Sequence, residues 1–405
     1  MSVSSRTAWR VVRHTAGELG DGTLTVVDPS GTRRFGSGSL AATMTVHDPA
    51  AYRQITRKGT VGLAESYAEG QWDADDLTTV IRLLSRAARP LTDTQDRIGQ
   101  AVRPLLDVTR RRGAPDKADD RAHVAAHYDL SNRFFELMLD ETMTYSCAVF
   151  DTPGLSLADA QRRKLDRLCR KLALSPDDHL LEIGTGWGGF ALHAATTYGC
   201  RVTTTTISSA QHDLAAKRVA DAGLSDRIRV LDLDYRDLTG TFDKLVSVEM
   251  IEAVDWRRHD EFFAACAGRL RPDGLMALQA ITIDDRSFDR AKHRPDFIRQ
   301  AIFPGGCIPS VESIARSVRR ATPFLVVDLE DIGRHYPETL RRWNENLHRQ
   351  RAAVDELGFD RAFQRRWDLY LCYCAAAFLE RHISDVQLVL AMPEWRPPLL
   401  TRGPG

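Results

Sequence analysis

The sequence lacks net charge and lacks long apolar runs. Its 55 basic and 55 acidic residues cancel, so a general electrostatic attraction to nucleic acid is not expected. No apolar run approaches the roughly 20 residues that a membrane-spanning helix needs. No apolar segment follows the first residues as it would in a signal peptide. We therefore expect a cytoplasmic protein, and any contact with a membrane is expected to be peripheral.

Cysteine is scarce as well, and metal-binding spacings are missing. The seven cysteines are scattered along 405 residues, and no two of them form a C-x-x-C pair. An odd and scattered set argues against both a disulfide framework and a zinc site. We expect reduced thiols and no bound metal.

What the sequence does contain is a glycine-rich run between an apolar strand and a helix. Residues 178–183 have strand character, and the run Leu-Glu-Ile-Gly-Thr-Gly-Trp-Gly-Gly occupies residues 181–189. Such a break exposes backbone N–H groups at the carboxyl edge of a parallel sheet, where nucleotide-like cofactors bind. Gly184 and Gly186 can adopt positive φ and let a cofactor approach the backbone closely.

The form of this run distinguishes between cofactors. It reads E-x-G-x-G-x-G rather than G-x-G-x-x-G, and it lacks the Lys-Ser/Thr of a phosphate-binding loop. About 20 residues further on, where a nicotinamide site would offer an acid to the ribose, residues 203–206 are threonines. The run is typical of S-adenosylmethionine (SAM) methyltransferases, and Glu182 is placed to position a polar group of that cofactor. A nicotinamide or flavin site and a turn that binds nothing are the alternatives.

The order of predicted elements indicates an α/β domain that follows a smaller unit. Residues 1–95 carry two strand patterns followed by helices, residues 96–120 are charged and broken by proline, and strands alternate with helices in residues 121–405. This alternation predicts a parallel sheet covered on both faces. Residues 284–350 are predicted to leave the sheet as a lid or substrate wall. The basic cluster within 96–120 is either a solvated linker or a segment attracted to anionic lipid headgroups.

Acidic and aromatic residues gather around the predicted cofactor site. Asp234 follows the third strand, where it can accept a hydrogen bond from an adenine amino group, and Glu249 and Glu252 follow the fourth strand. Because unpaired carboxylates are costly to bury, these two glutamates are either solvated or serve a cationic cofactor or intermediate. The aromatic segments at 127–135 and 144–150 either pack in the ordinary way or face a sulfonium ion.

Several motifs in a fixed order carry a resemblance to a known family. They are His127-Tyr128-Asp129, Tyr145-Ser146-Cys147, the glycine-rich run, residues 247–254, residues 302–306, His335-Tyr336 and residues 370–375. From about residue 120 to about residue 390, the chain closely resembles the cyclopropane-fatty-acyl-phospholipid synthases, a family that includes the mycolic acid cyclopropane synthases. The likeness is weaker before residue 120, where residues 62–72 look like the family's N-terminal domain.

The resemblance implies a Rossmann-like class I SAM methyltransferase domain with a smaller α+β N-terminal domain of the lipid-binding type and a lid-like insertion. It implies a SAM site made of Tyr128, Tyr145, Ser146, Gly184, Gly186, Thr206, Gln211, Asp234 and Tyr235. The turn and the sheet edge add Glu182, Trp187, Gly188 and Glu249 to that site. A bicarbonate ion is implied as general base, with a shell of Cys147, Glu252, Gln279, Ile281 and Tyr336. Glu252, Tyr336 and Cys374 are the residues expected to be catalytic.

Two residues depart from the family pattern. Gln279 stands where many bacterial members place a histidine in the bicarbonate shell, and Glu249 stands where some members have glycine. Glutamine can hydrogen-bond an anion but cannot ionise. These changes resemble a subgroup of the family, so activity is still expected.

The family implies transfer of a methyl carbon from SAM to the cis double bond of an acyl chain in a membrane phospholipid. The resulting carbocation loses a proton and gives a cyclopropane, which is our first expectation, or a 10-methylene chain, which a partner reductase would turn into a methyl branch. A homodimer bound peripherally to the inner face of the membrane is also implied. The alternatives from other classes are a lipid-binding protein without activity and a methyltransferase for small soluble substrates.

Overall fold

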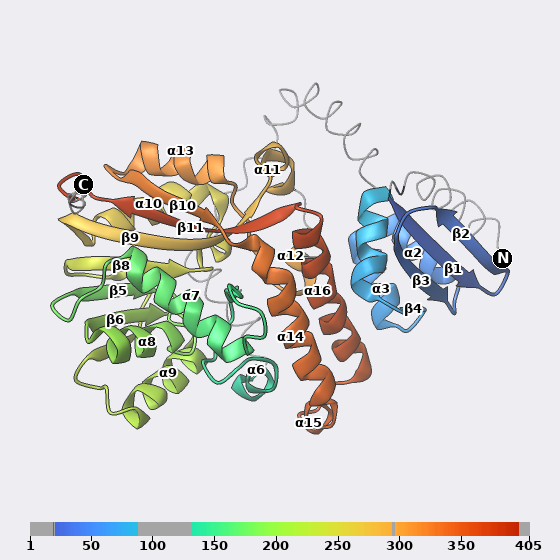
Figure 1. The fold of residues 1–405 in the computed structure, drawn as a ribbon, viewed down its shortest axis with the longest axis horizontal. Coiled ribbons are helices and arrows are strands. Elements are labelled where there is room, and N and C mark those ends of the chain that lie inside the picture. Colours follow the sequence, from blue (N-terminus) through green and yellow to red (C-terminus); the bar gives the residue numbers. More distant parts are fainter. Residues whose placement is uncertain (1–18, 20, 88–130, 294–295, 397–405) are drawn as a thin grey trace, which may run out of the picture. The chain divides into compact units, whose positions relative to one another are not determined.

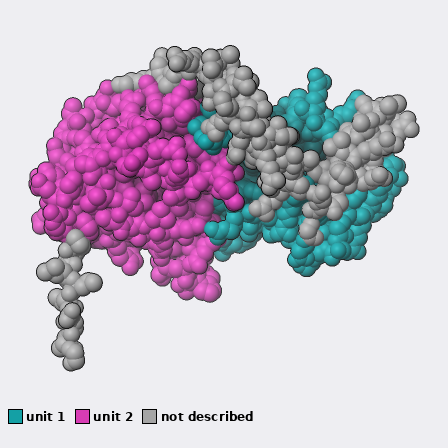
Figure 2. All heavy atoms as spheres, turned by 90° about the horizontal axis from the view of Figure 1, so that it is seen from above, with its two compact units in different colours: residues 1–115, 289–304, 336–383 teal, residues 116–288, 305–335, 384–405 magenta. Residues whose placement is uncertain are grey.

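The computed structural model describes residues 19, 21–87, 131–293 and 296–396. The chain divides into two compact units, coloured teal and magenta in Figure 2. Unit 1 contains residues 1–115, 289–304 and 336–383, and unit 2 contains residues 116–288, 305–335 and 384–405. The predicted linker at 96–120, with its basic cluster, lies outside the described residues. The predicted domain boundaries at 95 and 120 therefore stay predictions.

Unit 2 is built on a seven-stranded sheet. Its strands lie in the order β10-β11-β9-β8-β5-β6-β7, and Figure 1 labels this order from β10 to β6. Strands β5 to β9 are parallel, and β10 pairs antiparallel with β11. The bounds are β5 His179–Ile183, β6 Arg201–Thr206, β7 Ile228–Asp232, β8 Phe242–Val248, β9 Leu270–Ile283, β10 Leu325–Asp331 and β11 Ile383–Ala391. The predicted α/β class with a largely parallel, Rossmann-like sheet is confirmed.

Alternating side chains of this sheet supply two apolar layers. In β5, Leu180 packs in the layer with α7 and α8, whereas Leu181 packs in the layer with α10 and α13. Because side chains alternate along a strand, a strand buried on both faces feeds both layers. The helices are α6 Asn132–Met138, α7 Leu157–Lys171, α8 Gly189–Tyr198, α9 Ser209–Asp221, α10 His259–Ala267, α11 Asp285–Ala291 and α13 Val311–Ala321. Short 3-10 turns occur at η2 Tyr235–Asp237, η3 Ile251–Ala253, η4 Trp256–Arg258 and η5 Gly333–His335.

Serine side chains fix where several of these helices begin. At the start of α7 the Ser156 hydroxyl accepts a hydrogen bond from the backbone N–H three residues further on. The Ser208 hydroxyl accepts one from the N–H of Gln211 at the start of α9. Ser310 and Ser313 form a reciprocal capping box at the start of α13. Each cap contributes about 1 kcal/mol, and the cap at Ser208 also sets the position of Gln211 in the site described below.

Unit 1 joins the N-terminal segment to helices from later in the chain. Its four-stranded sheet has the order β2-β1-β3-β4, with β1 Gly22–Asp28, β2 Gly31–Gly36, β3 Leu40–Val46 and β4 Trp72–Ala74. Its helices are α2 Ala50–Lys58, α3 Thr60–Ala68, α12 Phe297–Ala301, α14 Tyr336–Arg349, α15 Arg351–Glu356 and α16 Arg361–Leu379, and residues 77–87 are also helical. Helix α16 packs against both α3 and α14. The guanidinium of Arg365 lies 3.9 Å from the ring centroid of Tyr67, which ties α16 to α3.

The structure corrects the prediction that residues 284–350 leave the sheet throughout. Residues 311–321 form α13, which packs on α10, and residues 325–331 form β10, the edge strand of the sheet. The sequence pattern misses this strand because its apolar side chains are not buried on one face; Leu325 and Val326 are 58% and 51% exposed. The role of the rest of this segment as a substrate wall stays a prediction.

Acidic side chains line this edge strand. Asp328 forms an ion pair with Lys171, and Glu330 forms ion pairs with Arg167 and Lys171 of α7. Charges on an edge strand discourage pairing with the edge of another sheet. In the described part of the chain, no helix is long and apolar enough to cross a membrane.

Candidate active site

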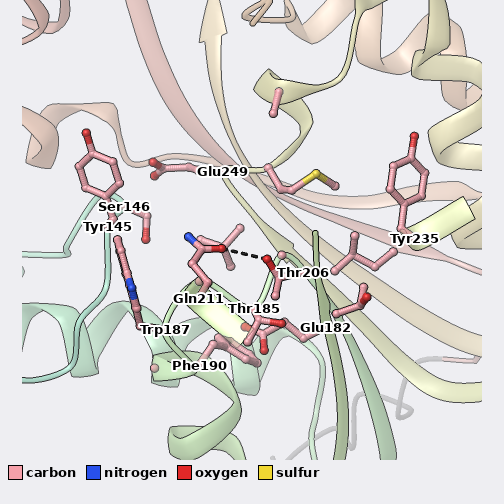
Figure 3. A pocket seen from close by; sticks show the side chains of 18 of the residues that line it. Tyr145, Ser146, Glu182, Thr185, Trp187, Phe190, Thr206, Gln211, Tyr235 and Glu249 are labelled. Atoms are coloured by element: carbon pink, nitrogen blue, oxygen red, sulfur yellow. Dashed lines mark hydrogen bonds between the residues drawn. The ribbon is translucent and has the colours of Figure 1, made fainter. Parts of the chain in front are cut away.

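A pocket opens in unit 2 at the carboxyl ends of β5, β6 and β8 (Figure 3). The turn after β5, the segment after β7 and the loop at 143–146 complete its wall. Eleven residues predicted to bind the cofactor line it: Tyr145, Ser146, Glu182, Gly184, Gly186, Trp187, Thr206, Gln211, Asp234, Tyr235 and Glu249. This edge of a doubly wound sheet is where such folds bind nucleotide-like cofactors.

Two of the predicted cofactor residues are not among the described residues that form this wall. Gly188 precedes α8 as its N-cap, with a φ of 83°, and is not among the residues that line the pocket. Tyr128 lies outside the described residues. The part of either residue in cofactor binding stays a prediction.

The turn after β5 requires glycine most strongly at Gly184. Its φ is 100°, and a Cβ added there would lie 3.1 Å from the side chain of Met250. The N–H of Gly184 donates to the carbonyl oxygen of Thr205 at 3.0 Å, which anchors the turn to β6. A side chain at this position would therefore strain the backbone and push Met250 within the pocket wall.

We predict that Gly184→Ala weakens SAM binding at least about tenfold and destabilises the fold by about 1–2 kcal/mol. Titration calorimetry with SAM and thermal unfolding measure the two effects. Gly223→Ala is the matched control, because Gly223 has a φ of 67° with no atom near the added Cβ. The control should lose some stability and keep its affinity for SAM. Equal affinities in the two variants would contradict the prediction.

Aromatic rings stand at two opposite sides of the pocket (Figure 3). Tyr145 and Trp187 lie at one side, and their ring centroids are 5.4 Å and 4.7 Å from that of Phe135. Tyr235 lies at the other side and packs edge-on against Phe262 at 5.5 Å. Ring faces attract cations, so this wall suits a sulfonium ion.

Hydrogen bonds between side chains hold several polar residues of the pocket in place. The Thr206 hydroxyl donates to Gln211 Oε1 at 2.9 Å, the dashed line in Figure 3. The Asp234 carboxylate accepts from the Nε of Arg236 at 2.8 Å, from its Nη2 at 2.6 Å and from its backbone N–H at 2.9 Å. The predicted role of Asp234 as an adenine acceptor therefore has to use lone pairs that Arg236 leaves available, and it stays a prediction.

Glu182 lies beneath the glycine-rich turn and is almost fully buried, with 2% exposure. Burial raises the pKa of its carboxyl to about 8, and a hydrogen bond with Thr204 opposes that rise. None of the described residues forms a hydrogen bond with its Oε2. The acid is therefore largely neutral at neutral pH.

Lys164 belongs to the site although the sequence analysis does not single it out. It lines the pocket from the buried side of α7 and is 0% exposed. Its Nζ donates to the hydroxyl of Ser146 at 2.6 Å. Burial lowers the pKa of Lys164, and the nearby acids, Glu249 first, act against that shift. A lysine on the apolar face of an amphipathic helix is the signal that could have identified it.

Glu249 is the centre of a buried polar cluster. It follows β8 with a φ of 47°, a conformation that costs a residue other than glycine about 1 kcal/mol. Its carboxylate extends into the pocket (Figure 3). Oε1 of Glu249 accepts from the backbone N–H of Cys147 and from Nε2 of Gln279, each at 2.8 Å. The N–H of Glu249 donates to the carbonyl oxygen of Gln279 at 2.8 Å.

Gln279 links the half-buried Glu249 to Asp385, a fully buried acid. Its Nε2 also donates to Asp385 Oδ2 at 3.0 Å, and its Oε1 accepts from Gln387 Nε2 at 3.0 Å. Burial first, and then the neighbouring Glu249, raise the pKa of Asp385 well above its ordinary value. Asp385 and Gln387 are not predicted as site residues; polar residues within the apolar strand at 383–391 are the signal that marks them.

Glu252 is the third acid of this region. Its Oε1 accepts from the backbone N–H of Ile281, and its Oε2 is inaccessible and has no hydrogen-bond partner among the described residues. Burial, and secondly Glu249, raise the pKa of Glu252 to about 8. Three members of the predicted bicarbonate shell thus donate to glutamates within unit 2: Cys147 and Gln279 to Glu249, and Ile281 to Glu252, which is itself the fourth member.

The other two residues predicted to be catalytic belong to unit 1. The ring of Tyr336, at the start of α14, stacks on Phe378 with centroids 4.3 Å apart. Cys374 lies on α16, and burial raises the pKa of its thiol. A thiol held in its protonated form is a poor nucleophile, which favours a structural role for Cys374. The contribution of both residues to the site stays a prediction.

Known proteins similar to this chain share its overall extent. Tuberculostearic acid methyltransferase UfaA1 of Mycobacterium tuberculosis is 39% identical over 399 residues, which cover 96% of this chain and 92% of that protein. The cyclopropane-fatty-acyl-phospholipid synthase of Escherichia coli K12 is 34% identical over 359 residues, which cover 88% of this chain and 89% of that protein.

Solved structures share the fold of much of the chain. Cyclopropane synthase MmaA2 from M. tuberculosis has a TM-score of 0.63 and 32% identity, over 69% of this chain and 99% of that one. Mycolic acid cyclopropane synthase CmaA1, complexed with SAH and CTAB, has a TM-score of 0.63 and 32% identity, over 67% and 98%. The family model described as mycolic acid cyclopropane synthetase matches residues 116–388. The chain therefore belongs to the mycolic acid cyclopropane synthetase family and is a SAM-dependent methyltransferase.

Proposed function

We propose that this enzyme transfers the methyl group of SAM to a cis double bond in an acyl chain of a membrane phospholipid. The observation that carries the proposal is that a SAM-type glycine turn lies at the same pocket as the first of three neighbouring acids, of which one is fully buried and two are half-buried. The acids are Glu249, which lines the pocket, with Asp385 and Glu252 beside it. Pre-oriented acids suit a reaction whose intermediate is a cation, and membership of the family supports an unsaturated lipid as substrate.

The side chains of the pocket supply binding, orientation and exclusion of water. Bound SAM supplies an electrophilic methyl group. Because an isolated alkene is a weak nucleophile, the donor methyl and the double bond must be held in line at short distance. Tyr145 and Trp187 on one side and Tyr235 on the other can flank the sulfonium ion. Burial of Ser146 and Trp187, at 3% and 1% exposure, keeps water from a cation that it would convert to an alcohol.

The fate of the cation decides the product. The double bond gives its electron pair to the new C–CH₃ bond, and the neighbouring chain carbon is left with the positive charge. If the new methyl group loses a proton at this stage, its C–H pair closes a cyclopropane ring. If a hydride first moves from the methylated carbon to the cationic carbon, loss of the methyl proton gives an exocyclic methylene. Both routes need a single base close to the methyl group.

We propose the methylene product for this chain. The relative named tuberculostearic acid methyltransferase aligns with 96% of the chain at 39% identity, and this likeness favours the methylene over the cyclopropane. A partner reductase would then complete the branch. The cyclopropane is the second candidate, because the E. coli cyclopropane-fatty-acyl-phospholipid synthase is 34% identical over 88% of the chain.

Product analysis tests both parts of the proposal. The purified enzyme is incubated with SAM that carries a labelled methyl group and with phospholipid vesicles that carry oleoyl chains. We expect the label in the lipid and vinylidene signals in its proton NMR spectrum. High-field cyclopropane signals would select the second candidate. Vesicles with saturated chains are the control and should take up no label. If the label never enters unsaturated lipid, the proposed function is wrong.

A phospholipid substrate also has consequences for the partners and the location of the enzyme. A phospholipid substrate requires contact with a bilayer, so we propose a cytoplasmic homodimer that binds the inner face of the membrane peripherally. Co-sedimentation with vesicles and analytical ultracentrifugation measure the two properties. Turnover on soluble acceptors without vesicles would favour a small-molecule methyltransferase, and failure to bind SAM in calorimetry would favour a lipid-binding protein.

A further inference from the structure

Three of the residues expected to hold a bicarbonate ion direct hydrogen-bond donors elsewhere. The N–H of Cys147 and the Nε2 of Gln279 both donate to Oε1 of Glu249 at 2.8 Å. The N–H of Ile281 donates to Glu252. At three positions of the expected shell, the donors thus bind carboxylates of this chain. These three donors therefore do not fit an additional anion.

The carboxylate of Glu249 has the chemical properties of such an ion. Like bicarbonate, it is planar, carries one negative charge when ionised and accepts N–H donors through its oxygens. It lines the same pocket as Tyr145 and Ser146 (Figure 3). The φ of 47° at Glu249 is natural to glycine. A glycine there would keep the backbone path and leave the space of the carboxylate empty.

Among the acids of this region, Glu249 is the one positioned to accept a proton from a group in the pocket. Glu249 lines the pocket, whereas Glu252 and Asp385 are not among the lining residues, and burial raises the pKa of both of these acids. The amine of the buried Lys164 donates to Ser146. Gln279 shares its amide between Glu249 and Asp385, and an amide cannot take up a proton as a histidine would.

We propose that Glu249 is the built-in general base of this enzyme and takes the place of a bicarbonate ion. This inference rests on the proposed function. After methyl transfer and the hydride shift, the positive charge is on the methylated carbon. The Glu249 carboxylate removes a proton from the methyl group, and the electron pair of that C–H bond becomes the π bond of the methylene. Glu249 is then a neutral carboxylic acid, and it returns its proton to water once the product has left.

Variants at Glu249, studied in buffer freed of carbon dioxide, test this inference. Wild-type turnover should not change when millimolar bicarbonate is added. Glu249→Gly should lose at least about 100-fold in turnover, and bicarbonate should restore part of it. Glu249→Gln should be equally slow but not restored, because its amide fills the space. Ala173→Gly is the backbone control: Ala173 is exposed and has a φ of 50°, and its variant should behave like the wild type.

A second measurement does not depend on turnover. Bicarbonate should raise the Tm of Glu249→Gly by several degrees and leave the Tm of the wild type and of Glu249→Gln unchanged. Dependence of wild-type turnover on bicarbonate, or full activity of Glu249→Gly without it, would overturn the inference. If the wild type transfers no methyl group to any lipid, the proposed function fails. The Tm shifts then still decide whether Glu249 occupies the anion position.

Discussion

Replacing Glu252 by glutamine is expected to leave SAM binding intact and to lower kcat about 100-fold, which corresponds to about 2.7 kcal/mol of activation free energy. Burial raises the pKa of Glu252 to about 8, so the acid is largely protonated while the pocket holds no cation. A sulfonium ion, and later a carbocation, lowers that pKa. The resulting carboxylate then stabilises the positive charge, which an amide cannot do.

Two measurements separate this effect from a loss of binding. Transfer of a labelled methyl group into oleoyl vesicles gives kcat, and calorimetry gives the Kd for SAM. Glu261→Gln is the control, because Glu261 is an exposed acid of α10 in an ion pair with Arg258, and this variant should keep wild-type kcat. Bicarbonate should not restore Glu252→Gln. A wild-type product yield from Glu252→Gln would remove Glu252 from the mechanism.

Replacing Glu182 by glutamine is expected to stabilise the ligand-free protein above neutral pH. The pKa of Glu182 rises from its ordinary value of 4.5 to about 8 on folding. The folded state therefore binds more protons than the unfolded state between these two values, and stability falls as the pH rises through this window. One such group lowers the free energy of unfolding by up to about 3 kcal/mol between pH 5 and pH 8. Glutamine at 182 removes this dependence.

Chemical denaturation at a series of pH values measures this prediction. The difference in unfolding free energy between Glu182→Gln and the wild type should be near zero at about pH 5 and should grow toward pH 8. Glu136→Gln, at an exposed residue of α6, is the control and should follow the wild type. A constant difference across the range would show that Glu182 does not titrate in this window.

The fold could be predicted largely because its signals are local. Positive φ at a turn, the period of an apolar strand and a serine at a helix start each depend on residues a few positions apart. The turn at Gly184 and Gly186 and the cap at Ser208 are of this kind. The strand at 325–331 could not be predicted, because an exposed edge strand has no buried face to impose alternation.

The sequence by itself therefore determined the SAM-type turn, the parallel sheet and the family, because local patterns and motif order encode them. Only the tertiary structure decided which donors the acids bind and how burial shifts their pKa values. Cys147, Glu249, Gln279 and Asp385 come from four separate segments, and hydrogen bonds join residues up to 106 positions apart. Whether a carboxyl group is charged depends on the burial and partners that folding gives it. For this reason the sequence suggested a bound anion, whereas the structure shows Glu249 accepting the donors expected to hold it.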